Sequence, residues 1–485
     1  MNADLPLWRS YIDGGFVAPD RAATLLPVHQ PATGAIYAQL QQAESAQVDQ
    51  AVAAARRAGP DWASLGGPAR AQWLRRLADH IEARLEIFAE AECRDTGKPL
   101  RLAREVDIPR AVANFRFFAS QAELFASECH SGAGAGLNYS LRQPVAAVAC
   151  ISPWHLPLYL FSWKIAPALA AGNAVVAKPS EVTPATAQLL AEALQALQWP
   201  AGVLNIVQGR GAITGAALVA HRHIKAVSFT GSTAVGAQIA RQCAEDFRKV
   251  SLELGGKNAA IVFADADVEA AVDTCVRAAF SNQGQICLCA SRILVQRSLL
   301  PRFREAFVAR ASALQVGDPS DPATDLGALV SAEHLAKVRS YIELAQAEGG
   351  RLLCGGERPE LPQALQGGWF LQATVFDQLP FDCRVNQEEI FGPVTTIIPF
   401  DDDDDALRQA NGTRYGLAAS VWTSDLSRAH RVAAALEAGI VWINCWMLRD
   451  LRTPFGGMKD SGMGREGGVE AMRFFTEAKN VCLNV

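Results

Sequence analysis

Several features that define large classes of proteins are missing from this sequence of 485 residues. A net charge of −5 leaves no excess of basic residues, so we expect no nucleic-acid partner. The most apolar stretches, near residues 145–151 and 165–177, are broken by Pro, Gly or Asn. They fall short of the about 18 residues that a membrane span needs, so we expect no membrane association. The opening MNADLPLWRS lacks a basic segment followed by an apolar one, which predicts no secretory signal.

The sequence also lacks any CxxC pair, internal repeat or low-complexity linker. Its eleven cysteines are scattered from Cys93 to Cys482, which is typical of reduced thiols in the cytoplasm and indicates neither a disulfide framework nor a metal site. Half of the residues are hydrophobic and a fifth are charged, as in ordinary globular proteins. The length leaves room for two or three domains.

Short β-rich runs alternate with helical stretches between residues 145 and 256. The helical stretches include 183–197, with Pro184 in its first turn, and 233–245; the runs are 146–151, 174–178, 204–207, 226–229 and 250–254. Buried strands that alternate with helices predict a parallel, doubly wound sheet. Ligands of such sheets gather at the carboxyl ends of the strands.

Three other regions have distinct patterns. Residues 44–125 read as amphipathic helices, and residues 257–455 as a second α/β region. Residues 126–144 are Gly-rich and then strand-like, which predicts an excursion out of the domain. The acidic run Asp401–Asp405 could be a partner site, but the solvated start of a helix is favoured, because carboxylates offset the helix dipole there.

Polar residues follow two of the predicted strands. Gly231 and Ser232 come after 226–229 and open a helix, where a glycine turn and free N–H groups can receive a pyrophosphate. A plain strand-to-helix turn is the alternative. Lys178 and Glu181 follow the strand 174–178, where a carboxylate can accept from ribose hydroxyls. Solvated surface charges are the alternative for these two.

Two further segments carry reactive groups. Glu253 lies between two leucines at the end of an apolar strand, so burial should raise its pKa and make it a candidate general base. Cys287 and Cys289 follow Gly284, and in an extended segment they would point to opposite sides. One of them is then a nucleophile, which needs a nearby base or a helix terminus, and the other packs.

Several motifs resemble those of the NAD(P)-dependent aldehyde dehydrogenase superfamily, in the same order and across nearly the whole chain. They are KPSE (178–181), FTGST (229–233), LELGGK (252–257), NQGQIC (282–287), EEIFGP (388–393) and PFGG (454–457). The resemblance implies an α/β fold whose doubly wound NAD-binding domain comprises 1–125 and 145–255. An α/β catalytic domain comprises 256–455, and a small β element for oligomerisation comprises 126–144 and 470–485. It also implies a cytoplasmic homodimer or homotetramer.

The same resemblance assigns roles to individual residues. Cys287 matches the nucleophile, Cys289 a packing residue, and Glu253 the base that deprotonates water. Lys178 and Glu181 match contacts of the adenosine ribose, and Ser232 matches a pyrophosphate contact. Glu389 matches the carboxylate at the nicotinamide ribose, and Phe391 its packing neighbour. Gly231 and Trp154 are further expected cofactor contacts, and Lys164 matches a lysine near the proton path. The cofactor is expected to be NAD, because Glu181 would repel the 2′-phosphate of NADP.

Within the superfamily, the chain most resembles the 2-aminomuconate and 2-hydroxymuconate semialdehyde dehydrogenases. The resemblance rests on the segments 107–119, 281–289, 444–457 and 464–468. Arg110 and Arg449 match arginines of the substrate tunnel, where a guanidinium can bind a carboxylate bidentately; a surface ion pair is the alternative. The expected substrate is a carboxylate-bearing semialdehyde, with 2-aminomuconate 6-semialdehyde in first place and 2-hydroxymuconate semialdehyde as the alternative. Such a substrate indicates the kynurenine pathway or aromatic degradation.

His155 departs from the family pattern. The matching position in ISPW-x-LPL is ordinarily an asparagine that donates to the oxyanion of the tetrahedral intermediate. An imidazole also has an N–H to donate, but it is bulkier and ordinarily titrates near pH 6.5. We therefore expect His155 in the active site, with an extra ionisation near pH 6–7. A satisfied core histidine, and a weakly active NAD-binding homologue, remain the alternatives.

Overall fold

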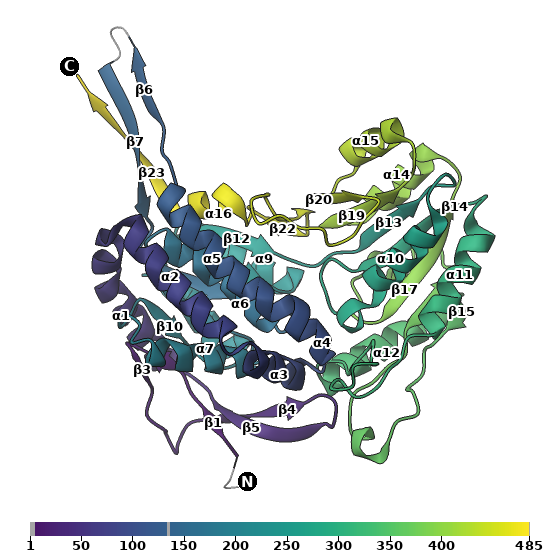
Figure 1. Ribbon diagram of the computed structural model, residues 1–485, viewed down its shortest axis with the longest axis horizontal. Helices are drawn as coiled ribbons and strands as arrows, with labels where there is room; N and C mark the ends of the chain where they lie inside the picture. The colour runs from purple at the N-terminus through teal and green to yellow at the C-terminus, as the bar shows by residue number, and fades with distance from the viewer. Residues whose placement is uncertain (1–4, 133–135, 485) are drawn as a thin grey trace.

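The structure, a computed structural model, describes residues 5–132 and 136–484. The ends of the chain at 1–4 and 485, and residues 133–135 of the predicted excursion, lie outside the described residues. Two large sheets, each with helices on both faces, form the body of the molecule, and a long β arm extends from one end (Figure 1). The predicted α/β fold is therefore confirmed.

The first sheet contains the predicted parallel strands. Its strands, in order, are β22 (Gly462–Met463), β12 (Lys249–Glu253), β11 (Ala226–Thr230), β8 (Ala147–Ile151), β9 (Ala174–Lys178), β10 (Leu204–Ile206), β2 (Tyr11–Ile12) and β3 (Gly15–Phe16). The five central strands are parallel, whereas β22 pairs antiparallel with β12 and β2 with β10. The carboxyl ends of β8, β11 and β12 therefore lie next to one another.

Alternate residues of this sheet face two different cores, as the pleat requires. Val148 and Val175 belong to the core beneath α6 (Pro157–Ala170). Ala149 and Val176 belong to the core beneath α1 (Ser45–Ser64) and α9 (Thr233–Glu245). The remaining helices of this region are α2 (Gly66–Glu82), α3 (Leu85–Thr96), α4 (Leu100–Leu102), the π-turn η1 (Ala103–Asp107), α5 (Ile108–Leu124), α7 (Ala185–Ala196), the π-turn η2 (Gly211–Gly215), α8 (Ala216–Ala220) and α16 (Gly468–Phe474).

The second sheet has seven strands in the order β15 (Arg351–Cys354), β16 (Thr374–Asp377), β17 (Val394–Phe400), β14 (Ala290–Gln296), β13 (Asn258–Val262), β19 (Ala418–Trp422) and β20 (Ile440–Ile443). One face packs on α14 (Asp403–Asn411) and α15 (Leu426–Ala435). The other packs on α10 (Val268–Phe280) and α11 (Leu300–Ser312). The remaining helices are η3 (Ser281–Gly284), α12 (Ala332–Ala347), η4 (Gln363–Leu365) and α13 (Arg384–Gln387). As favoured from the sequence, the acidic run opens α14, with Asp402 as its N-cap.

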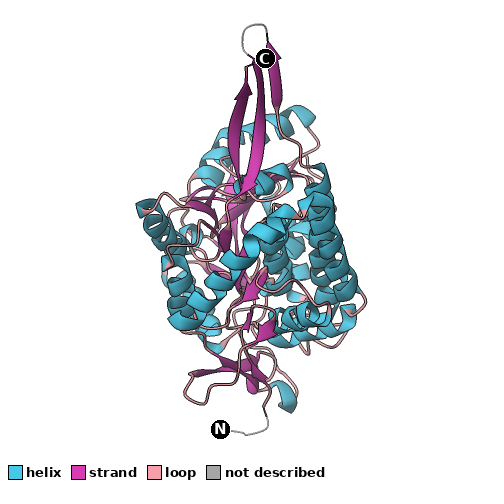
Figure 2. Cartoon of the chain, turned by 90° about the vertical axis from the view of Figure 1, so that its left-hand side faces the viewer, coloured by secondary structure: helices cyan, strands magenta, loops and turns pink. Residues whose placement is uncertain are grey.

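The predicted excursion is a β arm that projects beyond the helices (Figure 2). It consists of β6 (Cys129–Gly132), β7 (Gly136–Pro144) and the C-terminal β23 (Thr476–Leu483), all antiparallel. Five further strands lie outside the sheets above: β1 (Leu7–Trp8), β4 (Leu25–Gln30) and β5 (Ala35–Gln41) form one sheet, and β18 (Tyr415–Gly416) pairs with β21 (Met458–Lys459). Within residues 5–132 and 136–484, every helix is too short or too polar to cross a lipid bilayer.

Candidate active site

A pocket of about 220 Å³ lies where the carboxyl ends of β8, β11 and β12 meet segments of the second sheet's region. The first region supplies Pro153, Trp154, His155, Thr230, Gly231, Ser232, Leu254 and Gly255, and the second supplies Cys287, His334, Lys337, Glu389 and Phe391. Seven of the residues singled out from the sequence share this pocket: Trp154, His155, Gly231, Ser232, Cys287, Glu389 and Phe391. Lys178 and Glu181 do not line it; Lys178 is the last residue of β9, and Glu181 follows three residues later.

Cys287 lies in a tight turn. The backbone of Asn282, Gln283 and Gly284 is left-handed, with φ of 53°, 57° and 70°, and the Cys289 N–H donates to the Ile286 carbonyl at 2.9 Å. The expectation of an extended segment is therefore wrong, because this turn reverses the chain before β14. The two thiols still differ in surroundings: Cys287 is partly exposed at the pocket, whereas the buried Cys289 Sγ lies 3.8 Å from the Ser281 carbonyl oxygen.

Burial raises the pKa of the Cys287 thiol, and the nearby carboxyls of Glu389 and Glu253 raise it further. Arg449 acts in the opposite direction. A thiol in these surroundings is protonated at neutral pH, so its reaction as a nucleophile needs a base that takes the proton.

Glu253 ends β12 and is buried, with 3% of its surface exposed. Within the described part of the chain, neither of its carboxylate oxygens has a hydrogen-bond partner. Burial, and then the charge of Glu466, raise its pKa well above the usual range, so the predicted direction is confirmed. Lys164 lies in the same buried group: its Nζ donates to Glu466 Oε1 at 2.6 Å and to Ser228 Oγ at 3.1 Å.

His155 is 4% exposed and lies against aromatic rings in this pocket. Its ring centroid is 5.1 Å from that of Phe391 and 5.9 Å from that of Trp154. Burial, together with the positive charge of Lys98, lowers the pKa of His155 to about 3. The expected ionisation near pH 6–7 is therefore wrong, because the sequence does not reveal how completely the imidazole is removed from water.

The residues matched to cofactor contacts occupy the ends of three strands. Glu181 receives the Gly211 N–H at 3.1 Å and the Lys178 ammonium at 3.2 Å. Although burial alone would raise the pKa of Glu181, Lys178 and these N–H donors lower it, so the carboxylate is ionised. Ser232 is the N-cap of α9 and accepts from the Val235 N–H at 3.3 Å.

Glu389 reaches the first region through a glycine pair. The Gly256 N–H donates to Glu389 Oε1 at 2.9 Å, and a Cβ on Gly255 would lie 2.5 Å from Oε2. Only a glycine at 255 therefore allows this approach. Phe391 has φ of 65° and turns its ring toward Trp154, with centroids 5.2 Å apart.

Two polar residues of this pocket, His334 and Lys337, lie outside every segment that was singled out from the sequence. His334 and Lys337 lie one turn apart on α12; His334 Nε2 is 2.6 Å from the Phe391 carbonyl oxygen, and Lys337 Nζ donates to the Glu389 carbonyl at 3.3 Å. Their helix has the polar and apolar pattern of any surface helix. Their place in the pocket follows only from their contacts with Phe391 and Glu389 in the folded structure.

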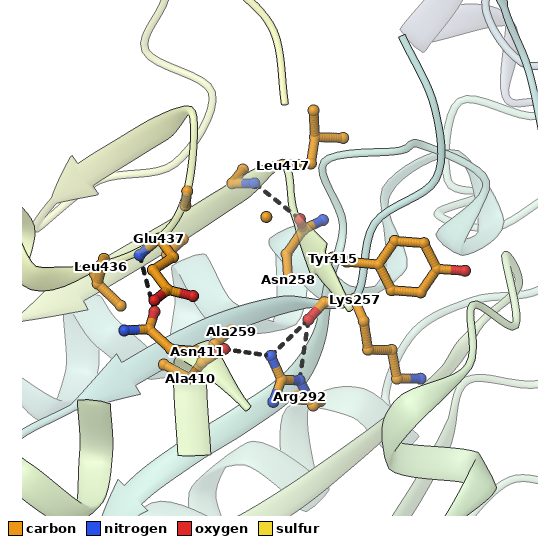
Figure 3. Close-up of a pocket in the computed structure, with 14 residues that line it drawn as sticks. Lys257, Asn258, Ala259, Arg292, Ala410, Asn411, Tyr415, Leu417, Leu436 and Glu437 are labelled. Atoms are coloured by element: carbon orange, nitrogen blue, oxygen red, sulfur yellow. Dashed lines mark hydrogen bonds between the residues drawn. The ribbon is translucent and has the colours of Figure 1, made fainter. Parts of the chain in front are cut away.

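The loop after β12 is anchored on its far side, at a second and smaller cavity (Figure 3). The guanidinium of buried Arg292 donates to the carbonyls of Lys257, Gln409 and Ala410 at 2.7–3.0 Å. The Lys257 side chain points away from Arg292, beside the Tyr415 ring (Figure 3). Burial, followed by the charge of Arg292, lowers the pKa of the Lys257 amine to about 7. These contacts fix the backbone that carries Glu253 and Gly255.

Arg110 and Arg449 lie in another pocket of about 510 Å³, whose wall includes Leu156 and Ile286. Because these two residues are the sequence neighbours of His155 and Cys287, the pocket approaches the reactive turn from the other side. The Arg110 guanidinium lies over Tyr159 at 5.2 Å, and that of Arg449 over Phe455 at 4.1 Å. Neither has a carboxylate within ion-pair distance among the described residues, so the surface ion-pair alternative is wrong.

Comparison with known proteins identifies the family and the fold of this chain. The profile named "Aldehyde dehydrogenase family" matches residues 16–481. The chain is 50% identical to 2-aminomuconic semialdehyde dehydrogenase of Danio rerio, over 97% of each chain. It is 48% identical to 2-hydroxymuconic semialdehyde dehydrogenase of Pseudomonas sp. (strain CF600), over 98% of this chain and 99% of that one. A crystal structure of PnpE in complex with Nicotinamide adenine dinucleotide superposes with a TM-score of 0.96 at 43% identity, covering 99% of this chain and 98% of that chain. The chain belongs to the aldehyde dehydrogenase family.

Proposed function

We propose that this aldehyde dehydrogenase oxidises a semialdehyde that carries a carboxylate, with 2-aminomuconate 6-semialdehyde as the principal candidate. The observation that carries the proposal is the pair Arg110 and Arg449, two guanidiniums without a carboxylate partner among the described residues. Both guanidiniums are half-buried, and Arg110 Nη2 is a buried donor without a hydrogen-bond partner among the described residues, so the pair favours an anionic ligand. Relatives named for aminomuconic and hydroxymuconic semialdehydes support this class of substrate.

The cofactor is proposed to be NAD, held in the pocket of about 220 Å³. The residues present fit such a group: the open N-terminus of α9 after Gly231 suits phosphates, and the Glu389 carboxylate suits ribose hydroxyls. When bound, NAD supplies a hydride acceptor. Glu181, ionised and already paired with Lys178, disfavours the 2′-phosphate of NADP.

The chemistry is proposed to begin with Cys287. Once water in the pocket has taken its proton, the Cys287 thiolate attacks the aldehyde carbon and gives the oxyanion of a thiohemiacetal. Loss of hydride from this oxyanion to a bound acceptor leaves a thioester. Glu253, whose raised pKa makes its carboxylate a stronger base, deprotonates the water that hydrolyses the thioester to a carboxylate. Lys164 and Glu466, joined at 2.6 Å, form the polar group through which the proton leaves Glu253.

His155 is proposed to donate to the oxyanion together with the Cys287 N–H. With a pKa of about 3, its imidazole is neutral at every working pH and offers one N–H. Nε2 is buried without a hydrogen-bond partner within the described ranges, which fits a group that is used only when substrate is present. Loss of such a donor typically lowers turnover about 100- to 1000-fold.

The domain assignment and the arm are part of this proposal. Residues 1–125 and 145–255 bind NAD, residues 256–455 supply the nucleophile, and the arm formed by 126–144 and 470–485 joins subunits into a homodimer or homotetramer. The exposure of β6 and most of β23 supports an interface there. Eleven free cysteines support a reducing compartment, proposed to be the cytoplasm.

The direct test is NADH formation with purified protein and a matched set of aldehydes. We expect a kcat/KM for 2-aminomuconate or 2-hydroxymuconate semialdehyde at least about 100-fold above that for a neutral aldehyde of equal length. The ratio between the two semialdehydes decides which of them is the preferred substrate. Tight NAD binding with negligible NADH formation from every aldehyde would favour the weakly active homologue.

A further inference from the structure

A buried ion cluster contacts the main chain of His155, and one of its members, Asp107, also lines the pocket that contains Arg110 and Arg449. Lys98, Glu92 and Asp107 are each at most 1% exposed. The Lys98 ammonium donates to Asp107 Oδ2 at 2.5 Å and to Glu92 Oε1 at 3.3 Å. Its third contact is the main-chain carbonyl of His155, also at 3.3 Å. All three donors of the ammonium are therefore used.

The same carbonyl receives a second donor from the nucleophile's turn. Asn282 Nδ2 donates to the His155 oxygen at 3.0 Å and to the Gln285 carbonyl at 2.8 Å. The His155 main chain is thus fixed between the Lys98 cluster on one side and the turn that carries Cys287 on the other. Its side chain has no such support: Nε2 has no partner among the described residues, so the ring direction depends on the backbone and on packing.

The cluster also fixes the segments on either side of the loop. Glu92 Oε2 accepts from the N–H of Leu158, in the first turn of α6, at 3.4 Å. Asp107 ends the π-turn η1, which forms a wall of the pocket that contains Arg110 and Arg449. Lys98 itself is held in place because Gly97 ends α3 with φ of 78° and its carbonyl accepts from the Ala328 N–H at 3.0 Å.

We infer that Lys98 is a positioning residue, which holds the His155 main chain against the pocket wall so that the imidazole N–H keeps a fixed direction toward the oxyanion. This inference rests on the donor role proposed for His155. A shift of about 1 Å at a catalytic group can lower turnover about 100-fold, so loss of the anchor should have a measurable effect on catalysis. The positive charge of Lys98 also contributes, after burial, to the lowered pKa of His155.

The test removes the cluster without leaving a buried charge. Removing Lys98 alone would leave two uncompensated carboxylates and could unfold the protein, so the test variant is Lys98→Met with Glu92→Gln and Asp107→Asn. We expect kcat to fall about 10- to 100-fold for neutral and carboxylate-bearing aldehydes alike, with the Kd for NAD within about twofold of the wild type. Arg248→Met is the control, since Arg248 is a buried cation that donates to main-chain carbonyls at Val219 and Gln242. It should lower the melting temperature but leave kcat unchanged.

A double-mutant cycle separates positioning from general destabilisation. In a His155→Ala background the same triple substitution should lower kcat by less than about twofold, because the donor that it positions is already absent. Equal fold-losses in both backgrounds would overturn the inference and leave the role of His155 intact. A wild-type kcat for His155→Ala would overturn the donor role itself, and the inference with it.

If the triple variant does not fold, Asp107→Asn alone should lower kcat about threefold or more in the wild type and not in His155→Ala. No loss in the wild type would overturn the inference.

Discussion

The side-chain amide of Asn258 donates to the carbonyl of Cys287 at 2.7 Å and to that of Cys289 at 2.9 Å. One residue at the start of β13 therefore fixes the backbone of both cysteines. Because Asn258 holds the main chains of both cysteines, a difference in function between Cys287 and Cys289 must come from the positions of their thiols. Replacing each thiol in turn by a hydroxyl therefore tests which of the two is the nucleophile.

Cys287→Ser should abolish acyl-enzyme formation while NAD binding stays within about twofold of the wild type. Cys289→Ser should keep most of the activity and lower stability by about 1 kcal/mol, because it places a hydroxyl in a buried position. Acyl-enzyme can be measured by mass spectrometry of the intact chain after mixing with aldehyde and NAD. An inactive Cys289→Ser with an active Cys287→Ser would reverse the assignment of the nucleophile.

Glu253→Gln should lower steady-state kcat at least about 100-fold, since thioester hydrolysis loses its base. A burst of NADH equal to the number of active sites should remain, because acylation precedes hydrolysis. Burial and Glu466 raise the pKa of Glu253, so its base form increases with pH over a range well above that of an ordinary glutamate, and wild-type kcat should rise with pH over the same range. The variant should lose this dependence, and stopped-flow absorbance of NADH measures both effects. A pH dependence shared by the two proteins would assign the ionisation to another group.

Strand patterns alone predicted Lys178, Ser232 and Glu253, whereas Arg110, Arg449, Glu389 and Phe391 were named only through the family resemblance. Residues that lie outside the quoted motifs were missed. Glu253 could be predicted because the carboxyl end of a buried strand in a parallel sheet faces the ligand site. Lys98, His334 and Lys337 could not, since each lies on a segment with an ordinary pattern and gains its position only from packing. The expected ionisation of His155 near pH 6–7 was wrong for the same reason, because the burial that lowers its pKa arises only when the core is assembled.

Arg110→Ala and Arg449→Ala should each reduce kcat/KM for carboxylate-bearing semialdehydes by about 2–4 kcal/mol in transition-state free energy. Neutral aldehydes of the same length should change by less than about 1 kcal/mol, because they do not use a guanidinium. Arg277→Ala is the matched control: it lines the same pocket but is exposed, so water screens its charge. Equal losses for both classes of aldehyde would remove Arg110 and Arg449 from substrate binding.

Glu181→Gln should shift cofactor preference toward NADP. The variant removes the negative charge that faces the ribose, and it leaves Lys178 free to pair with a 2′-phosphate. We expect the ratio of kcat/KM for NADP to that for NAD to rise at least about tenfold. Glu192→Gln, on the same side of the sheet but bonded only to Gln188 within the described residues, is the control. An unchanged ratio in Glu181→Gln would separate this carboxylate from cofactor choice.

His155→Asn should leave kcat unchanged or higher, and His155→Ala should lose about 2–4 kcal/mol of transition-state stabilisation. Because the pKa of His155 is about 3, this residue should not titrate between pH 5 and 8. The pH–rate profiles of the wild type and of His155→Asn should therefore have the same shape over that range. Equal kcat values for the wild type, Asn and Ala would make His155 a packing residue.

The same pKa gives His155 an effect on stability whose sign is fixed. In the unfolded chain its imidazole binds a proton below about pH 6.5, whereas in the folded protein it stays neutral down to about pH 3. The unfolded state therefore binds more protons in this window, and the free energy of unfolding must fall as pH falls, by up to about 1.4 kcal/mol per pH unit from this residue. His155→Asn lacks this proton, while Glu92, Asp95 and the other buried groups are the same in both proteins. Urea unfolding of the two proteins can be measured at about pH 7, 6 and 5. As the pH falls, the free energy of unfolding of the wild type should decrease more steeply than that of the variant. Parallel slopes would place the imidazole in contact with water, in conflict with its burial between Trp154 and Phe391.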